Sequence, residues 1–146
     1  MRDMPAPPRA PATTAPTSAA VPLWRKLGVR EGWTLALVGA PEGFDVGPLP
    51  LAVTTRRSAG GDPDLTVWFV RSRAALERRI SVMAPRGEHG GLWIAWPKRT
   101  SPLASDLSDE VVRRAAIANG LVDFKVCAID SDWSGLRFNR RRQPGE

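Results

Sequence analysis

Lys98, Thr100 and Ser101 are the residues of this sequence whose types and spacing best suit the binding of a charged ligand. They follow directly after the apolar run 92–96. A lysine supplies positive charge and two hydroxyl groups can donate hydrogen bonds, a combination that suits an anion or another polar ligand. Asp130 stands at the end of a second apolar run and offers an acceptor. The four residues predict a small polar binding site.

Glu42 and Trp133 complete the candidate site. Glu42, in the turn Ala-Pro-Glu-Gly-Phe, would add a carboxylate, and Trp133 or Trp96 would form an apolar wall. The same residues also have a structural interpretation. Lys98 and Asp130 could form an ion pair that joins two loops, while Trp133 packs in the core and Glu42 is a solvated turn residue. The sequence leaves both interpretations open.

Other catalytic groups are sparse. Cys127 lies within an apolar run and is expected to be a buried structural thiol. His89 precedes a glycine pair and is expected in a solvated loop. One histidine and one cysteine are too few for a zinc site built from these ligands alone. No phosphate-binding loop, nucleophile elbow or His-Glu-x-x-His motif is present. We therefore expect no catalytic residue, metal or cofactor.

Alternating strands and helices must position the candidate residues. Short apolar runs without polar alternation, bounded by Gly and Pro, predict strands that are buried on both faces. Strands are predicted at 33–38, 51–55, 65–70, 92–96, 124–129 and 136–139. Helices are predicted at 22–28, from the N-cap Ser72 to about residue 84, and from the N-cap Ser108 to 119. Pro41 suits the first position of a further short helix.

This order predicts an α/β fold with a mostly parallel, Rossmann-like sheet flanked by helices. The last two strands are joined by a turn too short for a crossover, so they should pair as an antiparallel hairpin. The segment 136–139 alternates like an exposed edge strand. Ligands of open parallel sheets bind beyond the carboxyl ends of the strands. The loops at 40–44, 97–101 and 130–134 should therefore meet on one rim.

Composition predicts one domain, 22–139, between two tails. Residues 1–21 are rich in Pro, Ala and Thr and are expected to be disordered. Residues 140–146 form a basic tail, also expected to be disordered. The formal net charge is +6, of which +1 lies in 1–21 and +2 in 140–146. The domain itself therefore carries only a modest excess, so nucleic acid is not the expected partner.

The single cysteine rules out a disulfide within the chain and fits a reducing compartment. No run approaches the roughly 20 apolar residues needed to span a bilayer. The first residues also lack the apolar core of a secretory signal. We expect a cytoplasmic protein without a membrane segment.

Four segments together resemble a known bacterial family. They are 24–33 (WRKLGVREGW), 40–44 (APEGF), 96–101 (WPKRTS) and 120–136 (GLVDFKVCAIDSDWSGL). These motifs are similar to the family named domain of unknown function 3052, and the similarity extends over about 22–142. The resemblance implies no established activity.

The element order is also similar to the later half of class I methyltransferases, which end in an antiparallel hairpin. This resemblance implies a truncated methyltransferase-like fold, and nothing about activity. The sequence departs from those enzymes at the donor site. The turn after the first strand offers only Gly39 and Gly43, with Pro41 between them, and 54–57 ends the second strand without an acid. Phosphate approach needs glycines and ribose recognition needs the acid, so binding of a dinucleotide or methyl donor is not expected.

Three functions stay open. The preferred one is a non-catalytic binding or interaction protein that takes an unknown small polar ligand or a protein partner at the rim. The alternative is an enzyme that acts on a small anionic substrate through Lys98 and Asp130. A weaker alternative is a basic accessory protein that contacts nucleic acid through its ends, including the arginines at 140–142.

Overall fold

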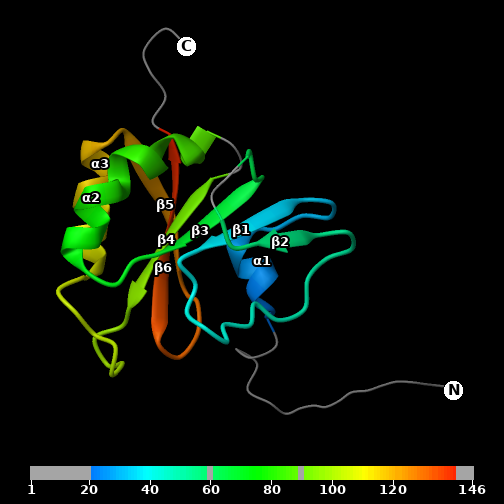
Figure 1. Cartoon of the computed structure of the whole chain (residues 1–146), viewed down its shortest axis with the longest axis horizontal. Helices are drawn as coiled ribbons and strands as arrows, with labels where there is room; N and C mark the ends of the chain where they lie inside the picture. The colour runs from blue at the N-terminus through cyan, green and yellow to red at the C-terminus, as the bar shows by residue number, and fades with distance from the viewer. Residues whose placement is uncertain (1–20, 59–60, 89–90, 141–146) are drawn as a thin grey trace, which may run out of the picture.

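A computed structural model describes residues 21–58, 61–88 and 91–140, which form one sheet with helices on both faces (Figure 1). The strands are β1 (Thr34–Val38), β2 (Thr54–Arg56), β3 (Leu65–Phe69), β4 (Leu92–Pro97), β5 (Leu121–Ala128) and β6 (Trp133–Arg140). The helices are α1 (Leu23–Leu27), α2 (Arg73–Met83) and α3 (Asp109–Ala118), with a 3-10 helix η3 (Ala84–Glu88) after α2.

The sheet is mostly parallel, as predicted. Within the described residues its strand order is β2-β1-β3-β4-β6-β5. Strands β1 to β4 run parallel to one another, while β6 is antiparallel to both β4 and β5. β5 therefore runs in the same direction as β4. The carboxyl ends of all five parallel strands consequently lie at one edge of the sheet.

The last hairpin is placed differently from the prediction. Residues 136–139 were expected at an exposed edge, but β6 lies between β4 and β5, where Leu136 is 1% exposed and Phe138 is fully buried. The polar alternation came from Arg137, whose side chain is half-buried rather than solvated. β5 is the true edge strand, and it exposes Val122 and Val126.

The connection between β1 and β2 contains no helix. Residues 41–43 form a turn closed by the Phe44 amide, which donates to the Pro41 carbonyl at 3.0 Å. Gly43 and Gly47 both have positive φ, which interrupts any helix that Pro41 could begin. The predicted strand 51–55 is also shifted, because only 54–56 pairs with β1. The apolar side chains of this connection pack on the sheet in place of a crossover helix.

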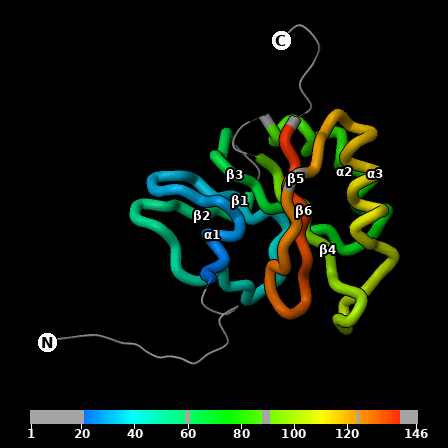
Figure 2. The backbone as a smooth tube through the Cα atoms, turned by 180° about the vertical axis from the view of Figure 1, so that it is seen from behind, coloured from blue at the N-terminus to red at the C-terminus, as the bar shows by residue number. Residues whose placement is uncertain are grey.

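The two faces of the sheet have separate cores. On one face, α2 and α3 pack over Trp68, Ile94, Trp96, Leu136 and Phe138. On the other face, α1 and the connection after β1 cover a second cluster. Its buried members are Leu27, Val29, Leu35, Leu37, Leu65, Val67, Phe69, Trp93, Ala95, Ile129 and Trp133. Figure 2 shows α1 on the opposite side of the sheet from α2 and α3.

The helix starts were predictable from their caps. The Ser72 hydroxyl accepts from the Ala75 amide at 3.1 Å, and the Ser108 hydroxyl accepts from the Val111 amide at 3.3 Å. Both are N-cap bonds that satisfy an amide with no partner inside its helix. Leu107 and Val112 are buried together, as the staple pattern around Ser108 predicted.

The short helix α1 is held to the sheet through the carbonyl oxygen of Leu27. This oxygen accepts from Trp93 Nε1 at 2.9 Å and from Arg137 Nη1 at 2.8 Å. Gly28 has φ +85°, and a Cβ there would lie 2.3 Å from Arg137 Nη1. Gly28 is therefore needed both for its left-handed backbone and for the passage of the arginine.

We expect Trp93→Phe to lower the free energy of unfolding by about 1 kcal/mol more than Trp68→Phe does. Both substitutions remove the same atoms from buried positions. Only Trp93 donates a hydrogen bond through its indole to another described residue. Urea unfolding of the two variants measures the difference. Equal losses would show that the bond to Leu27 contributes nothing.

Candidate functional site

The loops after β1, β3, β4 and β5 meet at one edge of the molecule, along the bottom of Figure 1. The Lys98 amide donates to the carbonyl of Asp132 at 2.8 Å, which joins the loop after β4 to the turn after β5. The predicted convergence of these two loops is confirmed. It follows from the shared direction of β4 and β5, which the antiparallel β6 separates.

Lys98 and Asp130 are neighbours at this rim, but they form no salt bridge in the described part of the chain. Asp130 Oδ1 instead accepts from its own turn, from the amides of Asp132 at 2.8 Å and Trp133 at 2.9 Å. Such a bond pattern is typical of a capping aspartate. The ion pair of the structural interpretation is therefore absent from the described residues, where Lys98 is half-buried.

Thr100 and Ser101 belong to the loop after Lys98, in different roles. Thr100 is exposed, whereas Ser101 is 7% exposed. The Ser101 hydroxyl oxygen accepts from the Leu103 amide at 3.0 Å, and the Ser101 amide donates to the Lys98 carbonyl at 3.0 Å. Ser101 thus shapes the loop that carries Lys98 and Thr100.

Trp133 is a core residue, as the structural interpretation predicted. It is 2% exposed and meets Phe69 edge to face, with ring centroids 5.1 Å apart. Phe69 meets Phe44 in the same way at 5.0 Å. This row of rings carries the loop that bears Glu42, whose side chain is exposed. Glu42 therefore reaches the rim through its loop, and no contact joins it to Lys98 or Asp130 in the described structure.

Arg71 is the rim residue that the sequence analysis missed. It stands just beyond β3, and its Nη1 donates to the Gly39 carbonyl at 3.0 Å. Its guanidinium carbon lies 5.4 Å from the centroid of the Trp133 ring. Arg71 thus links the loop after β1 to the turn after β5. Its position after a buried strand matches that of Lys98, and this was the signal that could have identified it.

The rim gathers cations from successive strand ends. Arg57 follows β2 and reaches the Phe44 carbonyl at 3.5 Å, Arg71 follows β3, and Lys98 and Arg99 follow β4. A guanidinium carries five donor hydrogens, and the bond to Gly39 uses only one of those of Arg71. An exposed arginine and a half-buried lysine at neighbouring strand ends suit the carboxylate or phosphate group of a small ligand.

The turn after β1 is not built like a dinucleotide site. In Rossmann folds this turn leads into a helix whose N-terminus holds the phosphates. Residues 39–53 contain no helix, and they cover the sheet instead. Gly39 is needed for packing, because a Cβ there would lie 2.9 Å from the Phe69 carbonyl oxygen. The helix N-terminus that would hold the phosphates of a dinucleotide is thus absent from this turn.

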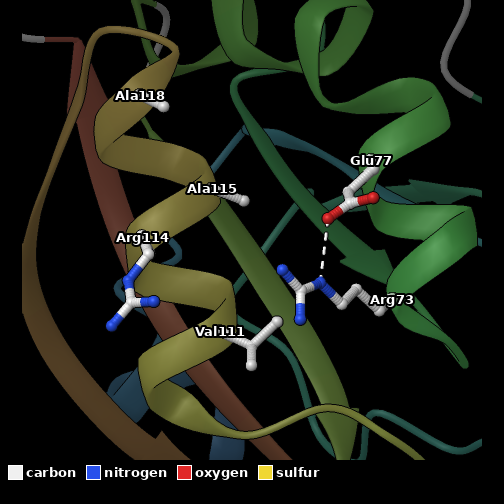
Figure 3. Close-up of a pocket in the computed structure, with 6 residues that line it drawn as sticks. All are labelled: Arg73, Glu77, Val111, Arg114, Ala115 and Ala118. Atoms are coloured by element: carbon white, nitrogen blue, oxygen red, sulfur yellow. Dashed lines mark hydrogen bonds and ion pairs between the residues drawn. The ribbon is translucent and has the colours of Figure 1, made fainter.

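A hollow of about 240 Å³ lies between α2 and α3, away from the rim (Figure 3). Arg73 Nε donates to Glu77 Oε2 at 2.9 Å on its α2 side, while Val111 and Ala115 of α3 face the groove. The ion pair is exposed and spans one helical turn, which makes it a weak surface contact. This groove is shallow and holds no convergent set of polar groups.

Across 21–58, 61–88 and 91–140, no group of three or more His, Cys, Asp or Glu side chains could hold a metal ion. No helix in those ranges has the length and apolar character required to cross a bilayer. His89 lies outside the described residues.

The fold is shared with a protein of the NADB-Rossmann superfamily from Streptococcus agalactiae, whose structure has been solved. The TM-score is 0.51 and the sequence identity is 11%, over 85% of this chain and 69% of that chain. At this identity the likeness shows the Rossmann-like fold alone. No family model matches the sequence, and no curated protein matches it. The resemblance to domain of unknown function 3052 is thus carried by sequence motifs only.

We expect Asp130→Ala to lower the free energy of unfolding by about 1 kcal/mol, because two turn amides lose their acceptor. Asp130→Asn keeps an acceptor oxygen and should lose less. Lys98→Met should change stability by less than about 0.5 kcal/mol, as expected for a lysine without an ion pair. Chemical denaturation of the three variants tests this. If Lys98→Met lowered the free energy of unfolding as much as Asp130→Ala, the result would indicate that Lys98 and Asp130 do form an ion pair.

The thiol of Cys127 should react slowly in the folded protein. Burial raises its pKa, against the opposing effects of Lys26 and Lys125. The unfolded chain therefore loses the thiol proton first, and stability falls as the pH rises above the pKa of the unfolded thiol. Alkylation rates measured against pH, with and without urea, should show a higher midpoint for the folded protein. Coincident midpoints would contradict this expectation.

Proposed function

We propose that this protein is a non-catalytic binding or interaction domain that takes a small anionic ligand at the rim of the sheet. The observation that carries the proposal is the placement of Arg71, which bonds the loop after β1 while its guanidinium lies beside Trp133. Lys98 stands at the next strand end and forms no ion pair with any described residue. Two cations at adjacent strand ends favour a ligand with a carboxylate or phosphate group.

The rigidity of this rim supports binding. Arg71 is held on one side by the Gly39 carbonyl and on the other by the Trp133 ring. The loop that carries Lys98 is fixed by a hydrogen bond from the Lys98 amide to the Asp132 carbonyl. Preorganised donors lose less side-chain entropy when a ligand binds. A small anion could therefore be captured here without a large rearrangement.

The competing function is an enzyme that acts on a small anionic substrate with Lys98 and Asp130. Their adjacent loops favour it, since a cation and a carboxylate stand at one rim. Against it, Asp130 Oδ1 is already engaged by two amides, and no nucleophile is placed beside a base among the residues named here. Membership of domain of unknown function 3052 and a cytoplasmic location belong to this proposal as well.

We expect inorganic phosphate or a small phosphorylated or carboxylated metabolite to raise the thermal midpoint of the protein. Lys98→Met and Arg71→Met should each raise the Kd of the ligand by on the order of ten-fold, because a charge-assisted hydrogen bond is lost. Arg71→Lys keeps the charge but loses the planar fork, so its Kd should lie between wild type and Arg71→Met. Thermal-shift titrations and native mass spectrometry measure these changes.

Arg79→Met is the matched control, because Arg79 is an exposed arginine of α2, outside the rim loops. It should leave the Kd within about two-fold of wild type. If Arg79→Met weakens binding as much as Arg71→Met, the ligand responds only to net charge. If Lys98→Met and Arg71→Met both bind like wild type, the rim is not the binding site. Turnover of a bound metabolite that stops in Asp130→Asn would instead favour the enzyme.

A further inference from the structure

The C-terminal end of α1 lies against the β5–β6 hairpin, on the face of the sheet away from α2 and α3 (Figure 2). Several basic residues come from these segments. Lys125 of β5 stands directly opposite Arg137 of β6. Arg137 reaches across to α1, where its Nη1 donates to the Leu27 carbonyl at 2.8 Å. Lys26 precedes that carbonyl in the chain, and Arg30 follows it by three residues. Four cations from three segments therefore share one surface.

Electrostatic effects are consistent with this placement. The pKa of Arg137 is lowered, first by burial and then by the positive charge of Arg30. The thiol of Cys127 feels both Lys26 and Lys125, from α1 and from β5. Like charges on directly opposite residues of paired strands are unfavourable. The Lys125–Arg137 pair thus gives the fold no electrostatic stabilisation.

Acidic partners are concentrated on the other layer. The described ion pairs join Arg73 to Glu77, Arg113 to Asp109 and Asp123, and Arg114 to Glu110, all on or beside α2 and α3. Lys26, Arg30 and Lys125 form no ion pair with any described residue. Glu31, the acid beside Arg30, is exposed and likewise forms none. The basic excess therefore lies on the α1 side.

We propose that this basic face, defined by Lys26, Arg30, Lys125 and Arg137, binds the phosphate backbone of a nucleic acid. Phosphate contacts need lysine and arginine at the surface and do not require an apolar anchor. Pairing of a partner's β-strand with the edge strand β5 is disfavoured. A bulge between Asp123 and Lys125, together with the exposed lysine, protects that edge.

Membranes and acidic proteins fit this surface less well than nucleic acid. α1 has only five residues, too few for an amphipathic helix that lies in a bilayer surface. An acidic protein would need a central apolar hot spot, whereas here the cations themselves form the centre. The modest net charge of the domain did not favour a nucleic-acid partner, and this proposal departs from that expectation because several cations gather on one face. The domain itself carries a basic face.

The test is fluorescence anisotropy of a labelled 20-base-pair DNA duplex with the full chain, titrated at several salt concentrations. Wild type should bind with a log–log salt slope of about −3, the value for three to four neutralised phosphates. Arg30→Glu/Lys125→Glu should weaken binding by at least about ten-fold and reduce the slope by about 2. Both residues are exposed, so thermal unfolding should confirm that this variant folds.

The matched control is Arg78→Glu/Arg79→Glu, which makes the same change of charge on the exposed side of α2. It should bind within about two-fold of wild type. A second control replaces the arginines at 140–142 with alanine and should keep most of the binding. Equal loss in the α2 control would show a net-charge effect and overturn the proposal. The proposal would also be overturned if only the tail variant lost DNA binding, or if wild type did not bind DNA at 50 mM salt. It would likewise be overturned if poly-glutamate competed as well as unlabelled DNA.

Discussion

The carbonyl oxygen of Leu27 is the contact on which one whole face of this fold depends. It belongs to the last residue of a helix of only five residues, and it accepts from an indole of β4 and a guanidinium of β6. So short a helix has little stability of its own in water. Two donors from the sheet fix its end and let α1 cover Trp93, which is fully buried. Gly28 follows with φ +85°, a left-handed conformation that favours glycine.

The same β6 strand creates the rim. By inserting antiparallel between β4 and β5, it places the turn at 130–132 against the backbone of Lys98. It also places Trp133 under the guanidinium of Arg71 and beside Phe69. The row from Phe44 through Phe69 to Trp133 then holds the loop after β1 against the sheet. Packing of apolar rings thus decides which charged groups meet.

Local signals were predictable from the sequence and pairing order was not. Ser72 and Ser108 cap helices within their own neighbourhood, so the sequence contains the whole interaction. The position of β6 depends on residues about 40 positions away in β4. Arg137 gave the strand the alternating pattern of an exposed edge, but its guanidinium binds a buried carbonyl 110 residues away in the sequence. The role of Arg71 could not be predicted for the same reason, since its partners Gly39 and Trp133 are distant in sequence. Asp130 was placed correctly at the rim, but its own turn competes for the carboxylate.

The two proposed surfaces have a common physical origin in the uneven coverage of the sheet. On the α2–α3 side, helices of 11 and 10 residues cover the strands, and several of their surface charges form ion pairs. On the other side a helix of five residues and a loop leave the end of the β5–β6 hairpin partly open. Lys125 then lies against Arg137 without a benefit to folding. The fold tolerates this arrangement because the buried cores on both faces outweigh one unfavourable pair. Lys26, Arg30 and Lys125 form no ion pair with any described residue, and we propose that these charges are the ones available for recognition.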